Sequence, residues 1–404
     1  MNYDGFRKTT TAGRLKPTRF FEKIILSDGP EIREVDGYGY VPDELPAGIR
    51  NEDIAAEIQP NLLRAERNLS RLDGLATVLD NPVLLMALFS QKEARHSSAI
   101  ENTFASATEL ALFDVDPTAV GENKRSEVGE VNGYLKALHH GFSSELPICL
   151  RLIKEMHHIL LSNSQRKRGT PGEFRTLQNA IGDENQSFDD AKFVPTPPEY
   201  LDESLQAFEH FVGNEKELPR LVRFAMAHYQ FECIHPFEDG NGRLGRLLVA
   251  LQLCEQAQLR LPFVYVSGFF EQHRDRYYSL LYNVSSDGEW IPWIKFFLDA
   301  VGTQADDALH RAKMLIGKRI EYKRLVVQKK ASPMLPVLID SLFKDPAITI
   351  AKASEIAEMM PNNAAKLIET LVDHNILIEV TGRKRNRVYL AHELLSIVHD
   401  PLGD

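Results

Sequence analysis

The sequence predicts a mainly α-helical protein with a small β-hairpin, followed by a C-terminal module of mixed α and β structure. Three observations support this fold class. From about Asp53 onward, apolar residues such as Ile54 and Ile58 recur at helical spacing. The segment HPFEDGNG (235–242) interrupts two helical apolar stripes, so we expect a loop held between two buried helices. After Pro333 the pattern changes to short helices followed by two short strands.

Composition limits the class of protein. Of the 404 residues, 43% are hydrophobic and 26% are charged, values close to those of globular proteins, and the length suits two or three domains. A formal net charge of −10 argues against a protein that coats nucleic acid over its whole surface. Any DNA contact must therefore be regional.

Cysteine usage and the N-terminus indicate a compartment. Cys149, Cys233 and Cys254 are too few and too scattered for a disulfide framework or a CxxC metal site. The start MNYDGFRKTT lacks the apolar region of a signal peptide, and no stretch approaches the length of a membrane span. We therefore expect a cytoplasmic protein that does not enter a membrane.

The N-terminal half divides into an arm and a helical region. Residues 1–50 are rich in Gly, Pro and charge, which predicts an irregular arm of short strands and turns. Asn81 followed by Pro82 is a sound helix start, because Asn caps a helix and Pro suits its first position. The turn-rich segment 169–200 predicts loops and a small hairpin.

The C-terminal half continues the helical pattern. Apolar residues predict helices over 218–233 and 244–251, and further helices over 274–284 and 290–316. The charged stretch 318–330 predicts a long exposed helix that acts as a connector.

The segment HPFEDGNGRLGR (235–246) has the chemistry of a phosphate site. Gly240 and Gly242 let the backbone approach a ligand, and a helix begins directly after them. Amide N–H groups at a helix N-terminus can bind an anion. Arg243 and Arg246 add planar guanidinium donors that suit phosphate oxygens.

The remaining residues of this segment suggest a reaction. Asn241 adds a side-chain amide, and Asp239 supplies an oxygen ligand for a hard cation such as Mg²⁺. His235 is the residue here that exchanges a proton near neutral pH, although a histidine at a helix end is often only structural. A base beside a magnesium polyphosphate is suited to attack by a hydroxyl at phosphorus. The pattern H-P-F-x-[D/E]-G-N-G-R-x-x-R has nine fixed positions, and the number of chance matches expected in a chain of this length is about 10⁻⁹.

This segment matches the signature HPFx[D/E]GNGRxxR of the Fic family without departure. EVNGYLKAL (130–138), PGEFRTLQNAIG (171–182) and FVPTPP (193–198) resemble the helix, pre-flap and flap segments of the family, so the resemblance covers about residues 50–300. It implies a Fic (Fido) helical core with a β-hairpin flap. It also implies transfer of AMP from ATP to a Ser, Thr or Tyr hydroxyl of a target protein, with release of pyrophosphate.

The resemblance also implies residue roles. His235 would be the general base, and Asp239 would bind Mg²⁺. The flap near Lys192 and Phe193 would align the target by strand addition. The nucleotide would be held by Gly240, Asn241, Gly242, Arg243, Gly245 and Arg246, with Tyr277 and Tyr278 near the adenine unless they are simple core aromatics.

An upstream segment resembles the inhibitory motif [S/T]xxxE[G/N] of the family. Ser97, Glu101 and Asn102 fit it, and four-residue spacing puts the first two on one helical face. Glu101 would pair with Arg246, which then could not hold the γ-phosphate of ATP. The ordinary alternative for Glu101 is a surface salt bridge or a helix-end interaction.

The C-terminal segment 353–390 resembles a winged helix-turn-helix domain, with residues 362–374 as its recognition helix. The wing tip carries the basic residues Arg383, Lys384, Arg385 and Arg387, which can contact phosphates without reading bases. The recognition helix offers few side chains for base readout. A protein-binding or dimerising module is the alternative.

The sequence thus leaves several functions open. The first is a protein adenylyltransferase that modifies a target protein and itself and is inhibited by Glu101. The second is a DNA-binding regulator or toxin-antitoxin-like component that senses nucleotide, and the third is removal of AMP by the same site. The predicted organisation is an N-terminal arm with helices (1–80), an inhibitory helix segment (81–105), the Fic core (106–305), a helical connector (306–332) and the winged-helix module (333–404).

Overall fold

The structure is a computed structural model that describes residues 9–10, 12–26, 29–77, 82–162, 164, 169–182, 191–255, 263–326 and 332–401. Helices make up most of it, with two small antiparallel sheets, so the predicted fold class is confirmed. None of the helices in these ranges is long and apolar enough to cross a membrane.

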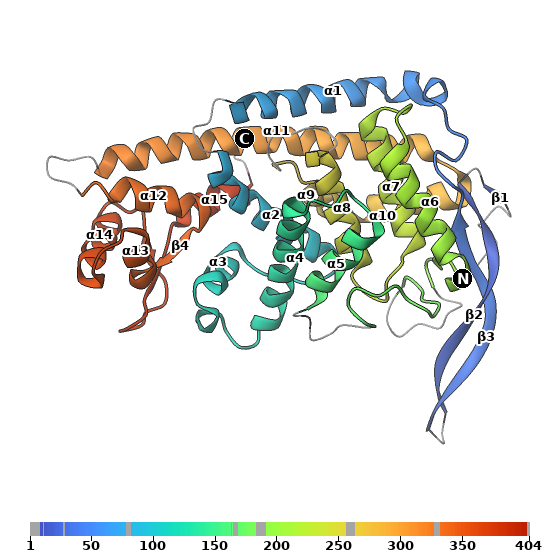
Figure 1. Ribbon diagram of the computed structural model, residues 1–404, viewed down its shortest axis with the longest axis horizontal. Coiled ribbons are helices and arrows are strands. Elements are labelled where there is room, and N and C mark those ends of the chain that lie inside the picture. The colour runs from blue at the N-terminus through green and yellow to red at the C-terminus, as the bar shows by residue number, and fades with distance from the viewer. Residues whose placement is uncertain are drawn as a thin grey trace.

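The N-terminal arm is a long β-hairpin. Strand β2 (Gly13–Leu26) pairs with β3 (Gly29–Pro42) along its whole length, and a short β1 (Thr9–Thr10) adds to β2. The hairpin extends away from the helical body (Figure 1). The prediction of short strands was wrong because the Gly, Pro and charged residues of this segment were taken as signs of turns, whereas Pro17 and Pro30 lie within the paired strands. Pro17 faces a largely unpaired edge of β2 and Pro30 lies on the edge strand β3, where a missing N–H is tolerated.

Two long helices run side by side along the body (Figure 1). They are α1 (Asn51–Thr77) and α11 (Trp290–Val326), and Arg64 of α1 forms an ion pair of 2.9 Å with Asp299 of α11. Helix α11 continues unbroken past residue 306, and its Tyr322 is buried. The predicted helix is confirmed up to Val326, and its Ile320 and Leu325 are exposed as expected. One face is nevertheless buried, because Tyr322 contacts Phe343 and Glu393 of the C-terminal helices, and residues 327–331 lie outside the described residues.

The helical core surrounds the HPFEDGNG segment. Helices α7 and α8 flank it and pack against each other, and Leu244 and Leu247 of α8 are fully buried, as predicted. The core helices are α4 (Arg125–Ser143), α5 (Leu150–Leu161), α6 (Leu201–Asn214), α7 (Arg220–Ile234) and α8 (Asn241–Glu255). The shorter elements are α3 (Ala107–Val115), η3 (Pro117–Ala119), η5 (Pro198–Tyr200), α9 (Ser267–Gln272) and α10 (Arg274–Asp287).

Helix α2 (Met86–Ile100) lies between the core and the C-terminal module. It contacts α4 and α8 of the core on one side and α12 and α15 of the module on the other. A 3₁₀ turn, η2 (Pro82–Leu85), precedes it where the sequence predicted the α-helix to begin. Proline fits the first turn of either helix type, which explains the difference, and Asn81 lies outside the described residues.

The C-terminal module has the predicted order of helix, short helix, helix and two strands, with one more strand and one more helix. Its three strands form an antiparallel sheet of order β4-β6-β5. Its elements are α12 (Leu335–Lys344), β4 (Ala347–Thr349), α13 (Ile350–Ile356), α14 (Pro361–Asp373), β5 (Ile378–Glu379), β6 (Val388–Leu390) and α15 (His392–His399).

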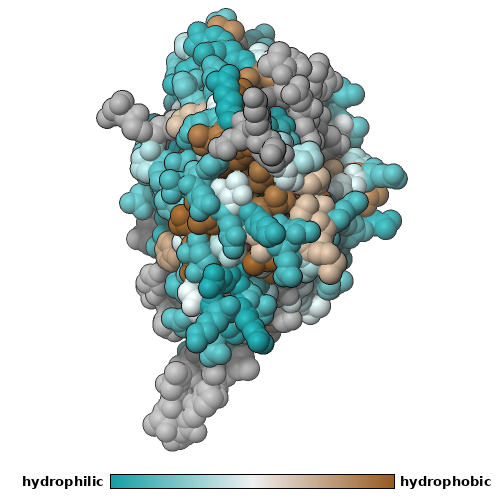
Figure 2. Space-filling view, turned by 90° about the vertical axis from the view of Figure 1, so that its left-hand side faces the viewer, coloured by the Kyte–Doolittle hydropathy of each residue, from teal (hydrophilic) through white to brown (hydrophobic). Residues whose placement is uncertain are grey.

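The surface at this end of the molecule is mostly hydrophilic, with hydrophobic residues in smaller groups (Figure 2). Within the module, Arg383 is turned toward the rest of its own chain. Its guanidinium forms an ion pair of 2.6 Å with Asp116 and donates to the carbonyl of Thr118 at 2.9 Å. This basic residue is therefore engaged inside the molecule, whereas Lys384 and Arg385 are exposed.

Candidate functional site

His235 ends α7 and opens the loop that leads to α8. Its backbone adopts a left-handed conformation (φ 50°, ψ 60°), which turns the chain sharply out of the helix. Its Nδ1 lies 3.3 Å from the carbonyl oxygen of Glu232, so an Nδ1–H donated there leaves the Nε2 lone pair free. Burial, and next the charge of Arg175, lower the pKa of His235 to about 4. The ring is therefore neutral at pH 7 and can accept a proton.

The loop is fixed by contacts between Asn241 and Phe237. The side-chain amide of Asn241 donates to the Phe237 carbonyl at 2.7 Å, and its oxygen accepts from the Phe237 N–H at 2.9 Å. Both residues are buried. Both polar atoms of the Asn241 side chain thus hold the loop, and its predicted phosphate contact stays a prediction. Its backbone N–H stays in the first turn of α8.

His157 of α5 contacts the same loop through a hydrogen bond and a ring stack. Its Nδ1 accepts from the Gly172 N–H at 2.8 Å, so Nε2 carries the proton and donates to the Asp239 carbonyl at 2.9 Å. The imidazole also stacks on the Phe237 ring, with centroids 3.7 Å apart. Burial lowers the pKa of His157 to about 4, which keeps this neutral tautomer. Sequence reasoning missed the residue because it lies within an ordinary apolar helical pattern.

Arg175 was also missed, although it ties three segments together. Its guanidinium donates to the carbonyls of His235 at 2.8 Å, Leu177 at 3.0 Å and Ile234 at 3.3 Å, and also to that of Thr196. The side chain is buried, and burial lowers its pKa to about 10, so it remains charged at pH 7. Arg175 thus holds the pre-flap and flap segments against the loop that carries His235.

The N-terminus of α8 has unused donors. Position 240 favours glycine because its backbone φ is +78°, a value that other residues rarely adopt. Arg243 is buried, and its Nε and one terminal nitrogen have no hydrogen-bond partner among the described residues. The carboxylates of Glu130 and Asp239 lie 3.6 and 3.5 Å from its guanidinium. A buried arginine with unpaired N–H groups at a helix N-terminus is suited to bind an anion.

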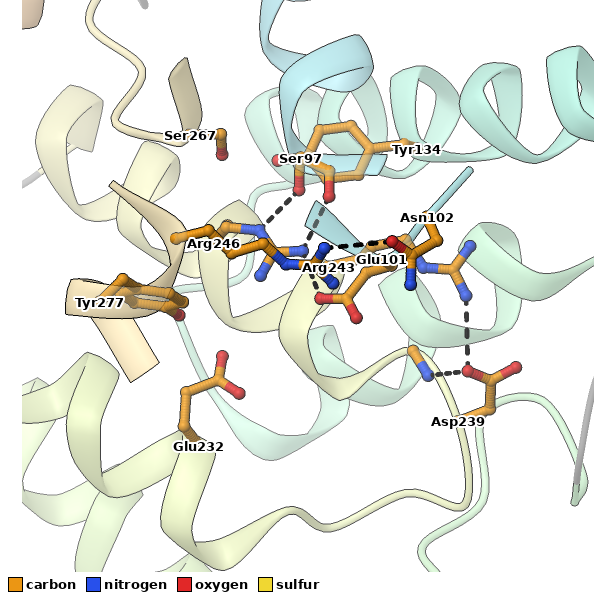
Figure 3. Close-up of polar contacts among 12 residues, drawn as sticks. Ser97, Glu101, Asn102, Tyr134, Glu232, Asp239, Arg243, Arg246, Ser267 and Tyr277 are labelled. Carbon is orange, nitrogen blue, oxygen red and sulfur yellow. Dashed lines mark hydrogen bonds and ion pairs between the residues drawn. The ribbon is translucent and has the colours of Figure 1, made fainter. Parts of the chain in front are cut away.

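Arg246 is held by Ser97 and Glu101 of the segment for which an inhibitory role was predicted (Figure 3). Its Nε donates to the Ser97 hydroxyl at 2.8 Å, and one terminal nitrogen donates both to the Ser97 carbonyl at 2.9 Å and to a Glu101 carboxylate oxygen at 2.8 Å. Burial opposes the charge of Arg246, but Glu101 overcomes it and raises the pKa of the guanidinium. Burial likewise opposes ionisation of Glu101, but Arg246 lowers its pKa on balance. The predicted contact is present, and both groups are charged.

Helix α2 ends at this contact. Glu101 is the cap residue that follows Ile100, so it lies just after α2 and not within it. A Cβ on Gly242 would collide with the Glu101 carboxylate, so this carboxylate lies against the first turn of α8. Asn102 adopts a left-handed conformation (φ 59°) and accepts from Arg274 at 3.1 Å. Glu101 therefore stands where an anion bound to α8 would stand.

Gly245 has a different role from the predicted one. A Cβ on this residue would collide with the Glu232 carboxylate and lie 3.2 Å from the Phe231 ring. Gly245 thus serves the close packing of α8 against α7. The predicted nucleotide contact of this residue stays a prediction.

The predicted adenine residues differ from each other. Tyr277 is buried, its hydroxyl forms a 2.8 Å hydrogen bond with Nε2 of His228, and its ring stacks on Phe270. It matches the core-aromatic alternative. Tyr278 is 41% exposed, and the Arg274 guanidinium lies over its ring.

The flap residues form one isolated bridge. The Ile181 N–H donates to the Phe193 carbonyl at 2.8 Å, and the N–H groups of Lys192 and Phe193 both donate to the Ile181 carbonyl. Residues 183–190 lie outside the described residues, so the predicted hairpin is observed only at this bridge. Phe193 packs on the Tyr40 ring, and the Tyr40 N–H donates to the Val194 carbonyl at 2.9 Å. The N-terminal arm therefore rests on the segment that follows the bridge.

Comparisons with known proteins find relatives of this chain. Residues 147–253 match the Fic/DOC family model, and residues 59–143 match the Fic/DOC family N-terminal model. Two curated relatives named protein adenylyltransferase Fic are each 29% identical to this chain over the aligned residues. The one from Drosophila grimshawi aligns over 52% of this chain and 41% of its own length, and the one from Aedes aegypti over 64% and 50%. The chain spans half the length of these curated relatives or less.

Solved structures show the same fold. A Fic family protein from Desulfovibrio desulfuricans G20 superposes with a TM-score of 0.54 at 18% identity, over 82% of this chain and 96% of that protein. A Fic domain containing signaling protein from Bacteroides thetaiotaomicron VPI-5482 gives 0.51 at 18% identity, over 62% and 97%. The solved structures show the fold, and the two family models identify residues 59–143 as a Fic/DOC family N-terminal region and residues 147–253 as a Fic/DOC domain.

Proposed function

We propose that this protein is an adenylyltransferase that transfers AMP from ATP to a Ser, Thr or Tyr hydroxyl of a target protein and of itself, and that Glu101 inhibits it. The observation that carries the proposal is the position of the Glu101 carboxylate on Arg246 and against Gly242, beside a neutral His235. The names of the curated relatives support the same activity.

The residues present fit a nucleotide polyphosphate. The unpaired nitrogens of the buried Arg243 and the N–H groups of the first turn of α8 would bind phosphate oxygens. Arg246 would bind the terminal phosphate once Glu101 has left it. The γ-phosphate and Glu101 would therefore compete for one guanidinium.

Asp239 fits a Mg²⁺ ion held mainly by phosphates. One of its carboxylate oxygens accepts from the Gly240 N–H at 2.6 Å, while its side chain is 32% exposed and open to a further partner. No group of three ligating side chains occurs in the described part of the chain, which suits a cation held by one carboxylate, phosphates and water. Bound there, Mg²⁺ would neutralise phosphate charge.

His235 would take the proton of the attacking hydroxyl through its free Nε2. The hydroxyl oxygen would bond to the α-phosphorus while the bond from that phosphorus to the bridging oxygen breaks, and pyrophosphate would leave. Arg175 would keep His235 in place through the backbone carbonyl of that residue. The main chain near Lys192 and Phe193 would align the target segment by strand addition.

Two other functions receive less support. Nucleotide sensing by a DNA-binding regulator needs no general base, and Arg383 of the wing is engaged with Asp116. Removal of AMP would need Glu101 to position a water molecule, whereas its carboxylate is bonded to Arg246. The contact of Arg383 thus leaves less support for DNA binding, and the contact of Glu101 leaves less support for removal of AMP.

The test uses three proteins: the wild type, Glu101→Gly, and the double variant Glu101→Gly with His235→Ala. Each is incubated with α-labelled ATP and Mg²⁺, and its intact mass is measured. We expect a mass gain equal to AMP in Glu101→Gly that vanishes in the double variant. No gain in Glu101→Gly, with or without an added candidate target, would contradict the proposal.

A further inference from the structure

A second carboxylate beside the site takes no part in the reaction proposed above. Glu232 lies in the last turn of α7, three residues before His235, and its side chain is 13% exposed. Its Oε1 is buried and has no hydrogen-bond partner among the described residues. In Figure 3 the carboxylate points from α7 toward the side of the site where Tyr277 and Arg246 lie. A buried polar atom without a partner calls for an explanation in a native structure.

The opposing helix makes room for this carboxylate. Because residue 245 is glycine, the Glu232 carboxylate can lie directly against α8, one residue from Arg246. A Cβ at this position would lie only 3.2 Å from the carboxyl carbon and would collide with Oε1. The packing of α7 on α8 thus places Glu232 beside the first turns of α8.

Several elements present titratable or charged groups to Glu232. The nearest one measured is Nδ1 of His228, 4.0 Å from Oε1. Burial raises the pKa of Glu232 to about 7, Arg246 opposes this shift and Glu101 adds to it. The facing groups come from α7, α8, α10 and the end of α2: His228, Cys233, Arg246, Tyr277 and Glu101.

We infer that Glu232 is a positioning residue, a second counter-ion for Arg246 that weakens polyphosphate binding once Glu101 has been released. In the inhibited state Glu101 supplies the negative charge beside Arg246, which favours the protonated form of Glu232. In the inhibited state the ion pair of Arg246 is with Glu101, and Glu232 makes none with it among the described residues. After Glu101 leaves, Glu232 ionises and takes over as the counter-ion of the guanidinium. This inference rests on the proposed function, because it takes the phosphates of ATP as the incoming anion.

The sign of the effect follows from the charges. Phosphates that arrive at Arg246 restore a negative charge near Glu232, so Glu232 must take up a proton from solvent. Affinity for ATP then rises as the pH falls through about 7 and declines as the pH increases. A glutamine at position 232 cannot ionise, so its affinity should stay high above pH 7. At pH 8 we expect ATP to bind several-fold to about tenfold more tightly to the Glu232→Gln protein, since one pKa unit corresponds to a factor of ten.

The experiment measures ATP binding by calorimetry in the full chain with Glu101→Gly and His235→Ala, so that no transfer occurs. This protein is compared with the same protein carrying Glu232→Gln, and with a control carrying Glu203→Gln, an exposed carboxylate on α6. Titrations between pH 6 and 8.5, in two buffers of different ionisation enthalpy, give the number of protons taken up. Because ATP itself titrates equally in all three proteins, the difference between them isolates Glu232.

The expected result is proton uptake that disappears with Glu232→Gln but not with Glu203→Gln, together with tighter binding at pH 8. Simple structural damage would weaken binding at every pH, and such an outcome, or unchanged proton uptake, would overturn the inference. If the protein with Glu101→Gly and His235→Ala binds no ATP at all, that result contradicts the proposed function and not the inference about Glu232. The pKa of Glu232 is then measured by carboxyl NMR in the unliganded protein, and a value that does not fall after Glu101→Gly overturns the inference.

Discussion

A Glu101 carboxylate oxygen lies 2.8 Å from a terminal nitrogen of Arg246, across 145 residues of sequence. The arginine is almost fully buried, whereas the glutamate side chain is about one-third exposed. An arginine this deeply buried needs a compensating charge, because an unpaired buried guanidinium is costly. Release of the carboxylate therefore requires another negative group near Arg246, which is the role inferred above for Glu232 before the phosphates of ATP arrive.

Ser97→Ala should loosen this inhibition in part. The substitution removes the hydroxyl that accepts from Nε of Arg246 but leaves the Ser97 carbonyl, which accepts from a terminal nitrogen. Hydrogen bonds to charged groups contribute about 1.5–3 kcal/mol, so losing one of them should raise auto-modification by about tenfold to a hundredfold. The rise should stay below that of Glu101→Gly. Auto-modification rates measured with α-labelled ATP test this, with Ser98→Ala as the neighbouring control, and a rate equal to the wild type contradicts it.

Arg175→Met should damage both stability and transfer. The arginine donates to four backbone carbonyls, and methionine keeps its volume but makes none of these bonds. Buried acceptors left unpaired cost about 1–3 kcal/mol each, so we expect the free energy of unfolding to fall by about 3 kcal/mol or more. Urea denaturation measures this.

Arg151→Met is the matched control for Arg175, since the Arg151 side chain is largely exposed. It should change the free energy of unfolding by less than about 0.5 kcal/mol. Equal effects of the two substitutions would show that the bridging role assigned to Arg175 is wrong. In the Glu101→Gly protein, Arg175→Met should also reduce transfer, because His235 loses the contact to its carbonyl.

Stability should fall in mild acid, partly because of His157. Its pKa is about 4 in the folded protein against an ordinary value of 6.5, so the unfolded chain binds more protons between these values. The contribution of about 3 kcal/mol is fully present above pH 6.5 and is lost as the pH falls toward 4. Unfolding by urea at several pH values should therefore show a decreasing free energy across this window.

His157→Gln should make that pH dependence shallower, by up to about 1.4 kcal/mol per pH unit. At pH 7 the variant should be less stable than the wild type, because it loses the stack on Phe237. His210→Gln, at an exposed position, should keep the wild-type slope. A slope that His157→Gln leaves unchanged would contradict the assignment of the neutral tautomer.

The part of the site that could be predicted from the sequence is the part that is contiguous in it. His235, Asp239 and Arg243 follow one another in a single motif, and their chemistry is apparent from their types. Glu101 was found because Ser97, Glu101 and Asn102 fit the inhibitory motif of the family, although its contact with Arg246 spans 145 residues. Roles within the motif were less certain, since Asn241 and Gly245 serve the loop and the packing of α7 on α8.

What could not be predicted depends on contacts between distant segments. Arg175 reaches the carbonyl of His235 across 60 residues, and His157 reaches that of Asp239 across 82. Neither residue stands in a pattern that differs from an ordinary turn or an ordinary helix. The long hairpin was missed for another reason: proline signals a break in a strand unless the partner strand on that side is absent, and the sequence does not say which edge is unpaired.

The last prediction concerns the contact between Arg383, in the loop between β5 and β6, and Asp116, which follows α3. The two side chains are 34% and 23% exposed and lie 2.6 Å apart. Arg383→Ala and Asp116→Ala, alone and together, form a double-mutant cycle in which we expect a coupling free energy of about 0.5–1 kcal/mol. Urea denaturation at low and high salt measures it, and the coupling should shrink at high salt. Lys384→Ala serves as the control, because this exposed neighbour should show no coupling with Asp116. If the effects of Arg383→Ala and Asp116→Ala simply add, the two side chains are not coupled, and the guanidinium of Arg383 is then available to an external partner.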